Sequence, residues 1–174
     1  MKAQITCLAL ILCLFAMPGF AQEKTKKQLK EEKKLEKQKQ IEEMVNAKTF
    51  VFNARTALPQ GYKSVNISTS SYFMRFNPDM ILSELPYYGK AYSGSGYGGE
   101  SGIKFEAKPE EMKIEKGKKN YNISAVVKAN NDTYRISLTL GFEGSGSLNI
   151  TSNNRSSISF QGEVAAPVKT EEKK

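Results

Sequence analysis

The sequence predicts a mainly β protein: an antiparallel meander that closes into a sandwich or flattened barrel, preceded by one N-terminal helix. Three observations predict this fold class. From residue 49 onward, apolar side chains occupy every second position of short segments, which is the pattern of half-buried strands. Turn-forming residues separate these segments at the spacing of about 8–12 residues that is typical of sandwiches and barrels. The apolar residues lie on one face only, whereas strands of parallel sheets are apolar on both faces.

Residues 1–21 are predicted to be a secretion signal. Lys2 gives a positive start, residues 5–17 form an apolar run, and Gly19-Phe20-Ala21 supplies small residues for cleavage before Gln22. The apolar run is too short for a comfortable membrane span, and no later window approaches the roughly 18 apolar residues that a span needs. We therefore expect an exported protein of the periplasm or cell envelope, with no integral membrane span.

The residue types in the chain exclude several kinds of site. Both cysteines, Cys7 and Cys13, lie in the predicted signal, so the processed chain would hold no disulfide and no cysteine-ligated metal. Lipidation of Cys13 is disfavoured because Leu10-Ile11-Leu12 lacks small residues. The chain has no histidine, the commonest general base and metal ligand. We expect no enzyme activity, no cofactor and no metal.

The formal net charge of +8 belongs largely to the flanking segments. Residues 22–48 hold nine lysines against six glutamates, and residues 168–174 hold three lysines against two glutamates. A folded nucleic-acid-binding domain would instead gather its positive charge on one face. The sequence therefore predicts no nucleic-acid partner.

Residues 22–48 are predicted to form a charged helix, from about Lys26 to Ala47. Lysine, glutamate and glutamine, all good helix formers, predominate there. Most of this helix should face solvent, and its few early apolar residues do not follow a coiled-coil repeat. Its last two turns carry the i, i+3, i+4 spacing of a helix that packs on another surface: Ile41, Met44 and Val45.

Residues 49–166 are predicted to form the antiparallel β domain, and residues 167–174 a disordered tail. The clearest element is a hairpin over residues 121–127 and 134–140, with its turn at Asn130-Asn131-Asp132. Further strands are expected around alternating apolar residues: Phe50, Phe52 and Ala54; Val65 and Ile67; Tyr72, Met74 and Phe76; Ile103, Phe105 and Ala107; Met112 and Ile114; Leu148 and Ile150; Ile158, Phe160 and Val164.

An aromatic segment, residues 85–92, is the best candidate for function. It runs into residues 93–99, where four glycines in seven residues favour a flexible loop. Tyrosine offers a flat apolar face and a hydroxyl, which suits sugars, peptides and amphipathic ligands. Two interpretations stay open: the segment covers an open end of the sheet, or it lines a recognition surface. In the second case the ligand-binding residues would be Tyr87, Tyr88, Tyr92 and Tyr97.

Two charged clusters have simpler explanations than a site. Glu110-Glu111 could suggest the carboxylate pair of a glycosidase, but adjacent strand residues face opposite sides of a sheet. A solvated strand surface is therefore expected. Lys116-Gly117-Lys118-Lys119 could bind anions, but a charged hairpin turn explains it as well and discourages edge pairing.

Several motifs together resemble a known family. They are Phe50-x-Phe52-x-Ala54 with the following Pro59, Leu85-Pro86-Tyr87-Tyr88-Gly89-Lys90-Ala91-Tyr92, Gly102-Ile103-x-Phe105 and Ile158-Ser159-Phe160-x-Gly162. From about Ala47 to Glu163 the chain is similar to the family called domain of unknown function 4251 (DUF4251), whose members are mostly exported and come mainly from Bacteroidota, which are Gram-negative bacteria. The resemblance implies a β-rich fold. It implies no catalytic residues, because the family has no assigned activity.

The sequence thus predicts an exported envelope protein that acts as a non-catalytic binding or accessory module. Its partner would be a small ligand or an envelope protein, whose identity the residues do not indicate. The alternative is a structural or assembly component of the envelope, tethered by the charged N-terminal helix. No residue pattern predicts the oligomeric state.

Overall fold

The structure, a computed structural model, describes residues 25–92 and 102–167. The predicted signal, the glycine-rich run with Tyr97, and residues 168–174 lie outside the described residues. Contacts divide the chain into two units, residues 1–32 and 33–174. The β domain and the second half of the helix belong to the later unit, and the fold described below is that of this unit.

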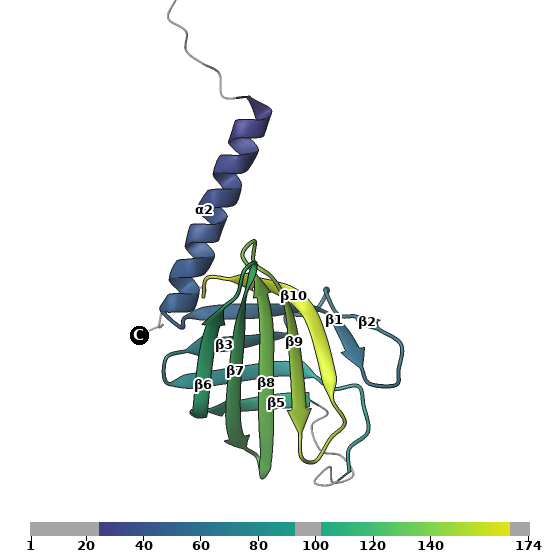
Figure 1. The fold of residues 1–174 in the computed structure, drawn as a ribbon. Helices are drawn as coiled ribbons and strands as arrows, with labels where there is room; N and C mark the ends of the chain where they lie inside the picture. Colours follow the sequence, from purple (N-terminus) through teal and green to yellow (C-terminus); the bar gives the residue numbers. More distant parts are fainter. Residues whose placement is uncertain (1–24, 93–101, 168–174) are drawn as a thin grey trace, which may run out of the picture. The chain divides into compact units, whose positions relative to one another are not determined.

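One helix and ten strands make up the described chain (Figure 1). All strand pairs are antiparallel, and the sheet follows the order β5-β4-β3-β1-β10-β9-β8-β7-β6, with β2 paired to β1. The elements are α2 (Lys26–Asn46), β1 (Phe50–Pro59), β2 (Val65–Asn66), β3 (Phe73–Asn77), β4 (Met80–Pro86), β5 (Gly102–Ala107), β6 (Pro109–Lys116), β7 (Asn120–Ala129), β8 (Asp132–Gly141), β9 (Ser145–Ser152) and β10 (Ile158–Ala165).

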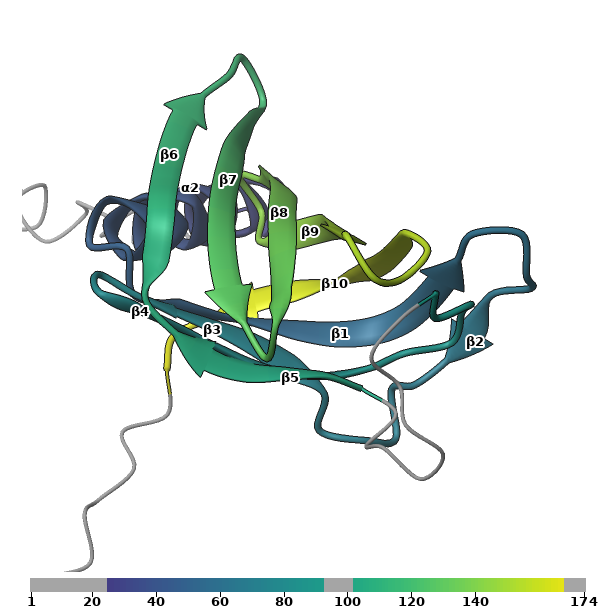
Figure 2. The ribbon, with the colours of Figure 1, turned by 90° about the horizontal axis from the view of Figure 1, so that it is seen from below.

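The sheet curls into a nearly closed barrel, which confirms the predicted fold class. Strands β1, β3, β4 and β5 form one layer, and β6 to β9 form a second layer whose strands cross the first (Figure 2). The pairing of β1 with β10 joins the layers. Strands β5 and β6 are the two edges of the sheet, although only Lys108 separates them along the chain.

The alternating apolar residues fill the space between the layers, as the sequence predicts. Phe50 stacks on Phe76, with ring centroids 4.6 Å apart, and Phe105 stacks on Tyr134 at 4.9 Å. The second of these pairs joins β5 to β8 across the interior. The largest fully buried side chains are Phe50, Phe52, Phe76, Phe160, Ile41, Met74, Ile81, Leu85, Ile103, Ile123, Leu138 and Leu140.

The junction of β1 and β10 depends on a glycine. A β-bulge lies between Ala54 and Thr56, and there β1 comes so close to Gly162 that a Cβ on this glycine would lie 2.0 Å from Asn53 O. Since bulges bend a strand and increase its twist, this one helps to turn the sheet from one layer into the other.

The last turns of α2 pack against the barrel, as predicted. Ile41 and Val45 are buried in the core, and Met44 is partly buried against it. Glu42 forms an ion pair with Lys116 at the end of β6. Leu35, by contrast, is 60% exposed. No helix in the described residues is long and apolar enough to cross a membrane.

Two local expectations needed correction. The predicted strands omit β4, because the buried Ser83 interrupts its apolar alternation; the Ser83 hydroxyl donates to Ile103 O at 2.7 Å, which satisfies it inside the core. The turn of the β7–β8 hairpin consists of Asn130 and Asn131 only, both with positive φ (52° and 59°), and Asp132 already belongs to β8. A two-residue turn of this kind matches the twist of the flanking strands.

Candidate binding site

The aromatic segment lies along the connection between β9 and β10. Ser156 N–H donates to Lys90 O at 2.9 Å, and Tyr92 N–H donates to Asn154 O at 2.7 Å. An isolated antiparallel bridge joins Ala91 to the same connection. These backbone contacts fix residues 90–92 against a part of the chain more than sixty residues away in sequence.

Tyr87 anchors the segment. Its hydroxyl lies 2.8 Å from Lys90 O, 3.1 Å from Ser156 O and 2.8 Å from Ser156 Oγ. The guanidinium of Arg155 lies 5.2 Å from the centre of the Tyr87 ring, and Arg155 Nη1 donates to Gly102 O at 2.7 Å. We call Tyr87, Lys90, Gly102, Arg155 and Ser156 the tyrosine clamp. Since its polar groups bond one another, the clamp holds β4, β5 and the β9–β10 connection together.

Gly89 leaves room for the clamp. A Cβ at this position would lie 2.5 Å from the Tyr87 hydroxyl and 2.7 Å from Ser156 Oγ, both shorter than a carbon–oxygen contact allows. Any larger residue would displace one of these two groups. The glycine of the Pro-Tyr-Tyr-Gly motif therefore leaves the space in which the Tyr87 hydroxyl forms its hydrogen bonds.

Beside the clamp lies an open, mainly apolar depression of about 540 Å³, which we call the aromatic groove. Tyr62 is 55% exposed and Tyr88 is 37% exposed. Neither hydroxyl makes a hydrogen bond to another described residue. The groove is lined by residues at the end of β1, in the turn after it, at the start of β2 and just after β4. These residues are Pro59, Tyr62, Lys63, Val65, Tyr88 and Gly89.

The lining suits an amphipathic ligand. The tyrosine rings, Pro59 and Val65 offer apolar surface, and Lys63 is the one charged residue among the lining residues. Its ammonium forms no ion pair with a described residue. An apolar surface with a single cation fits a ligand that has an apolar body and one anionic group.

The four predicted tyrosines occupy different environments. Tyr87 belongs to the clamp, Tyr88 lines the groove, and Tyr92 is 69% exposed without lining the groove. Tyr97 lies outside the described residues. Sequence reasoning missed Tyr62 and Lys63, because they lie in a turn after Gly61, which has a φ of 79°, and only the pairing of β2 with β1 brings this turn beside the groove.

The paired carboxylates do not converge on one another. Glu110 pairs with Lys128 at 2.9 Å, and Glu111 pairs with Lys113 at 2.7 Å. The hydrogen bond from Lys113 lowers the pKa of Glu111, whereas a general acid needs a raised pKa. No cluster of His, Cys, Asp or Glu that could hold a metal occurs among the residues the structure describes. The lysine run after β6 forms the β6–β7 turn.

Comparisons with known proteins point to one family. The sequence model of the family described as "Domain of unknown function (DUF4251)" matches residues 32–164. A crystal structure of a DUF4251 family protein from Bacteroides eggerthii DSM 20697 superposes with a TM-score of 0.60 at 17% identity, and the match covers 75% of this chain and 87% of that chain. At this identity the likeness shows the shared fold. No curated protein matches the chain.

Proposed function

We propose that this chain, which belongs to the DUF4251 family, is an exported, non-catalytic binding module of the bacterial envelope. The name of the family assigns no activity. The proposed ligand is an amphipathic anion, held in the aromatic groove. Export is supported by the charged start, apolar run and cleavage pattern of residues 1–21. A secretion signal of this kind directs a protein out of the cytoplasm, so the proposed location is the periplasm or the cell envelope.

The observation that carries the binding role is the exposure of Tyr62 and Tyr88 beside Lys63. Rigid aromatic side chains present a large contact surface at little cost in conformational entropy. The clamp fixes the backbone next to Tyr88, so little ordering is needed when a ligand arrives. An ammonium at the groove then selects the anionic end of the ligand.

The test uses octanoate and octanol as probes, since they share an apolar chain and differ in charge. Titration of the processed protein, followed by the NMR signals of the tyrosine rings, should give saturable shifts of Tyr62 and Tyr88 with octanoate. Octanoate should bind more tightly than octanol. Tyr62→Ala should weaken octanoate binding by about fivefold, as expected for a loss of about 1 kcal/mol.

Lys63→Gln is the matched variant for the charge. It should weaken the binding of octanoate and leave that of octanol unchanged, so that the preference between the probes disappears. Both substitutions lie at exposed positions, and the midpoint of thermal unfolding should stay the same. The role would be disproved if octanoate shifted the signals of residues outside the groove and not those of Tyr62 and Tyr88. It would also be disproved if the Lys63→Gln protein still preferred octanoate to octanol.

The alternative, an assembly component tethered by the helix, draws support from the surface of α2. Its first half is charged, and Leu35 and Leu29 are 60% and 43% exposed, so a partner helix could cover them. Under this proposal, deletion of residues 22–40 releases the protein from its envelope complex in cell fractionation. Unchanged fractionation would count against the tether, while the octanoate titration would still report on the groove.

A further inference from the structure

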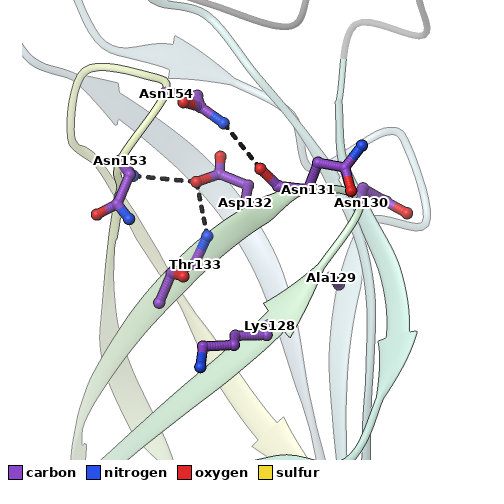
Figure 3. A pocket seen from close by; sticks show the side chains of 8 residues that line it. All are labelled: Lys128, Ala129, Asn130, Asn131, Asp132, Thr133, Asn153 and Asn154. Carbon is purple, nitrogen blue, oxygen red and sulfur yellow. Dashed lines mark hydrogen bonds between the residues drawn. The ribbon is translucent and has the colours of Figure 1, made fainter.

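A second pocket, polar in character, lies where the β7–β8 turn meets the β9–β10 connection (Figure 3). Its volume of about 500 Å³ falls in the usual range of ligand sites, about 300–1,000 Å³. It shares no lining residue with the aromatic groove. We call it the amide pocket, because four asparagines are among its lining residues: Lys128, Ala129, Asn130, Asn131, Asp132, Thr133, Asn153 and Asn154.

Asp132 holds the two sides of the amide pocket together. Its buried carboxylate accepts hydrogen bonds from Thr133 N–H at 2.7 Å and from Asn153 N–H at 3.1 Å, as Figure 3 shows, and from the hydroxyl of Ser152. Because both carboxylate oxygens accept hydrogen bonds, Asp132 has a structural role: it links β8 to the end of β9. The pocket is therefore formed before any ligand arrives, which lowers the cost of binding.

Three of the asparagine side chains use only one of their two polar groups in hydrogen bonds to described residues. Asn154 Nδ2 donates to Asn131 O at 3.2 Å, and Asn130 Nδ2 donates to Lys104 O at 2.8 Å. The side-chain oxygen of each accepts no hydrogen bond from the described residues and can act as an acceptor. Asn153 Oδ1 accepts from Arg135 Nη1 at 3.1 Å, which leaves its NH₂ group as a donor. The hydroxyl of Thr133 bonds to none of the described residues, so fixed donors and acceptors both remain.

Backbone requirements explain only two of these asparagines. Asn130 and Asn131 have positive φ, a conformation that asparagine tolerates better than most residues. Asn153 and Asn154 do not have positive φ, since Lys48 is the only other non-glycine residue in the described ranges that does. Their amides instead bond to neighbouring segments, Asn154 to Asn131 O and Asn153 to Arg135, and each has a second polar group that bonds to none of the described residues.

The charges in the amide pocket are compensated. Lys128 pairs with Glu110 at 2.9 Å, and hydrogen bonds satisfy Asp132. The pocket thus favours a neutral ligand over a free ion. An extended peptide is disfavoured too, because β7 and β8 are each paired on both sides and peptides commonly bind by adding a strand to a free edge.

An exposed aromatic residue adjoins the pocket wall. Tyr92 N–H donates to Asn154 O at 2.7 Å, and the Tyr92 side chain is 69% exposed. Amides bond hydroxyl groups, since each hydroxyl is both donor and acceptor, and an aromatic face suits the C–H surface of a sugar ring. We propose that the amide pocket binds a neutral sugar residue of a glycan, with the amides of Asn153 and Asn154 bonding its hydroxyls.

The experiment titrates the isotope-labelled, processed protein with glucose, galactose, mannose, N-acetylglucosamine and disaccharides of these sugars, up to tens of millimolar. At least one sugar should give saturable shifts of the amide signals of Asn153 and Thr133. Asn153→Ala should weaken its binding by about fivefold or more, which corresponds to about 1 kcal/mol for one hydrogen bond. Thr133→Val, which replaces the hydroxyl with a methyl group of similar size, should weaken it by a similar factor.

Asn122→Ala is the control, since it removes an exposed amide of β7 outside the pocket. It should leave sugar binding unchanged, as should Tyr62→Ala in the aromatic groove, so this result is separable from the octanoate test. The proposal fails if no sugar gives saturable shifts, if the shifts map to the aromatic groove, or if Asn153→Ala and Thr133→Val both bind with the original affinity.

Discussion

Tyr87 and Tyr88 are neighbours in sequence but belong to regions with opposite properties. In the tyrosine clamp, the hydroxyl of Tyr87 has three oxygen neighbours within 3.1 Å, and Arg155 covers its ring. In the aromatic groove, Tyr88 and Tyr62 keep exposed rings, and their hydroxyls bond to no residue that the structure describes. One tyrosine has its bonding capacity satisfied within the chain, while the other two have it available for a ligand.

This difference shows what the Pro-Tyr-Tyr-Gly motif specifies. Tyr87 and Gly89 are both required by one structural device, because the glycine makes space for the tyrosine hydroxyl. The device fixes the backbone beside the groove and also residues 90–92, which lead to the amide pocket. The clamp therefore adjoins two candidate sites of different chemistry, since Gly89 lines the apolar groove and Asn154 lines the amide pocket.

Removal of the Tyr87 ring should have the largest effect on stability. Tyr87→Ala empties a half-buried position and leaves Arg155 without its ring contact, so we expect a loss of about 3 kcal/mol in the free energy of unfolding. Urea denaturation measures it. Tyr88→Ala, at an exposed position, should cost below about 1 kcal/mol. Equal losses for the two variants would remove the distinction between clamp and groove.

A methyl group at Gly89 should have the next largest effect. Gly89→Ala forces the Tyr87 hydroxyl or Ser156 to move, and overpacking of this kind costs about 1–3 kcal/mol. The same denaturation experiment measures the loss. Gly61→Ala provides a useful comparison, because its Cβ would meet no atom within 4 Å and only its φ of 79° opposes the change. If Gly89→Ala were as stable as the original protein, the clamp would not require the glycine.

The smallest effect should come from the ion pair outside both regions. The hydrogen bond from Lys116 lowers the pKa of Glu42 below its ordinary value of 4.5. A lowered pKa in the folded state stabilises the protein above pH 4.5, and this contribution disappears as the pH falls through the folded-state value. The unfolding midpoints of the original protein and Glu42→Gln should therefore differ slightly at neutral pH and converge in acid. A difference that grows in acid would contradict this sign.

Most of the fold could be predicted from the sequence because alternation and turn residues are local signals. The β7–β8 hairpin and the docking turns of α2 illustrate this, since the residues of each lie close together along the chain. Strand β4 escaped prediction because Ser83 occupies an inward position. Its bond to Ile103 O depends on β5, twenty residues further on, and no local pattern reveals it.

The candidate sites were less predictable, because they combine distant segments. The sequence identified Tyr88, but its groove partners Tyr62 and Lys63 become neighbours only through the pairing of β1 and β2. Tyr87 could not be told from Tyr88 by residue type, since the difference comes from Ser156 in the β9–β10 connection. The amide pocket likewise joins residues 128–133 to residues 153–154.

The distinction between clamp and groove is tested most directly by one paired measurement on Tyr87→Phe and Tyr88→Ala. The affinity for octanoate and the midpoint of thermal unfolding are determined on the same samples of each variant. Tyr87→Phe should lower the midpoint, because the clamp loses hydrogen bonds, and should weaken octanoate binding less than Tyr88→Ala does, because Tyr87 does not line the groove. Tyr88→Ala should keep the midpoint and weaken binding by about fivefold, as for a loss of about 1 kcal/mol. The reverse result, with binding lost in Tyr87→Phe and stability lost in Tyr88→Ala, would contradict the account.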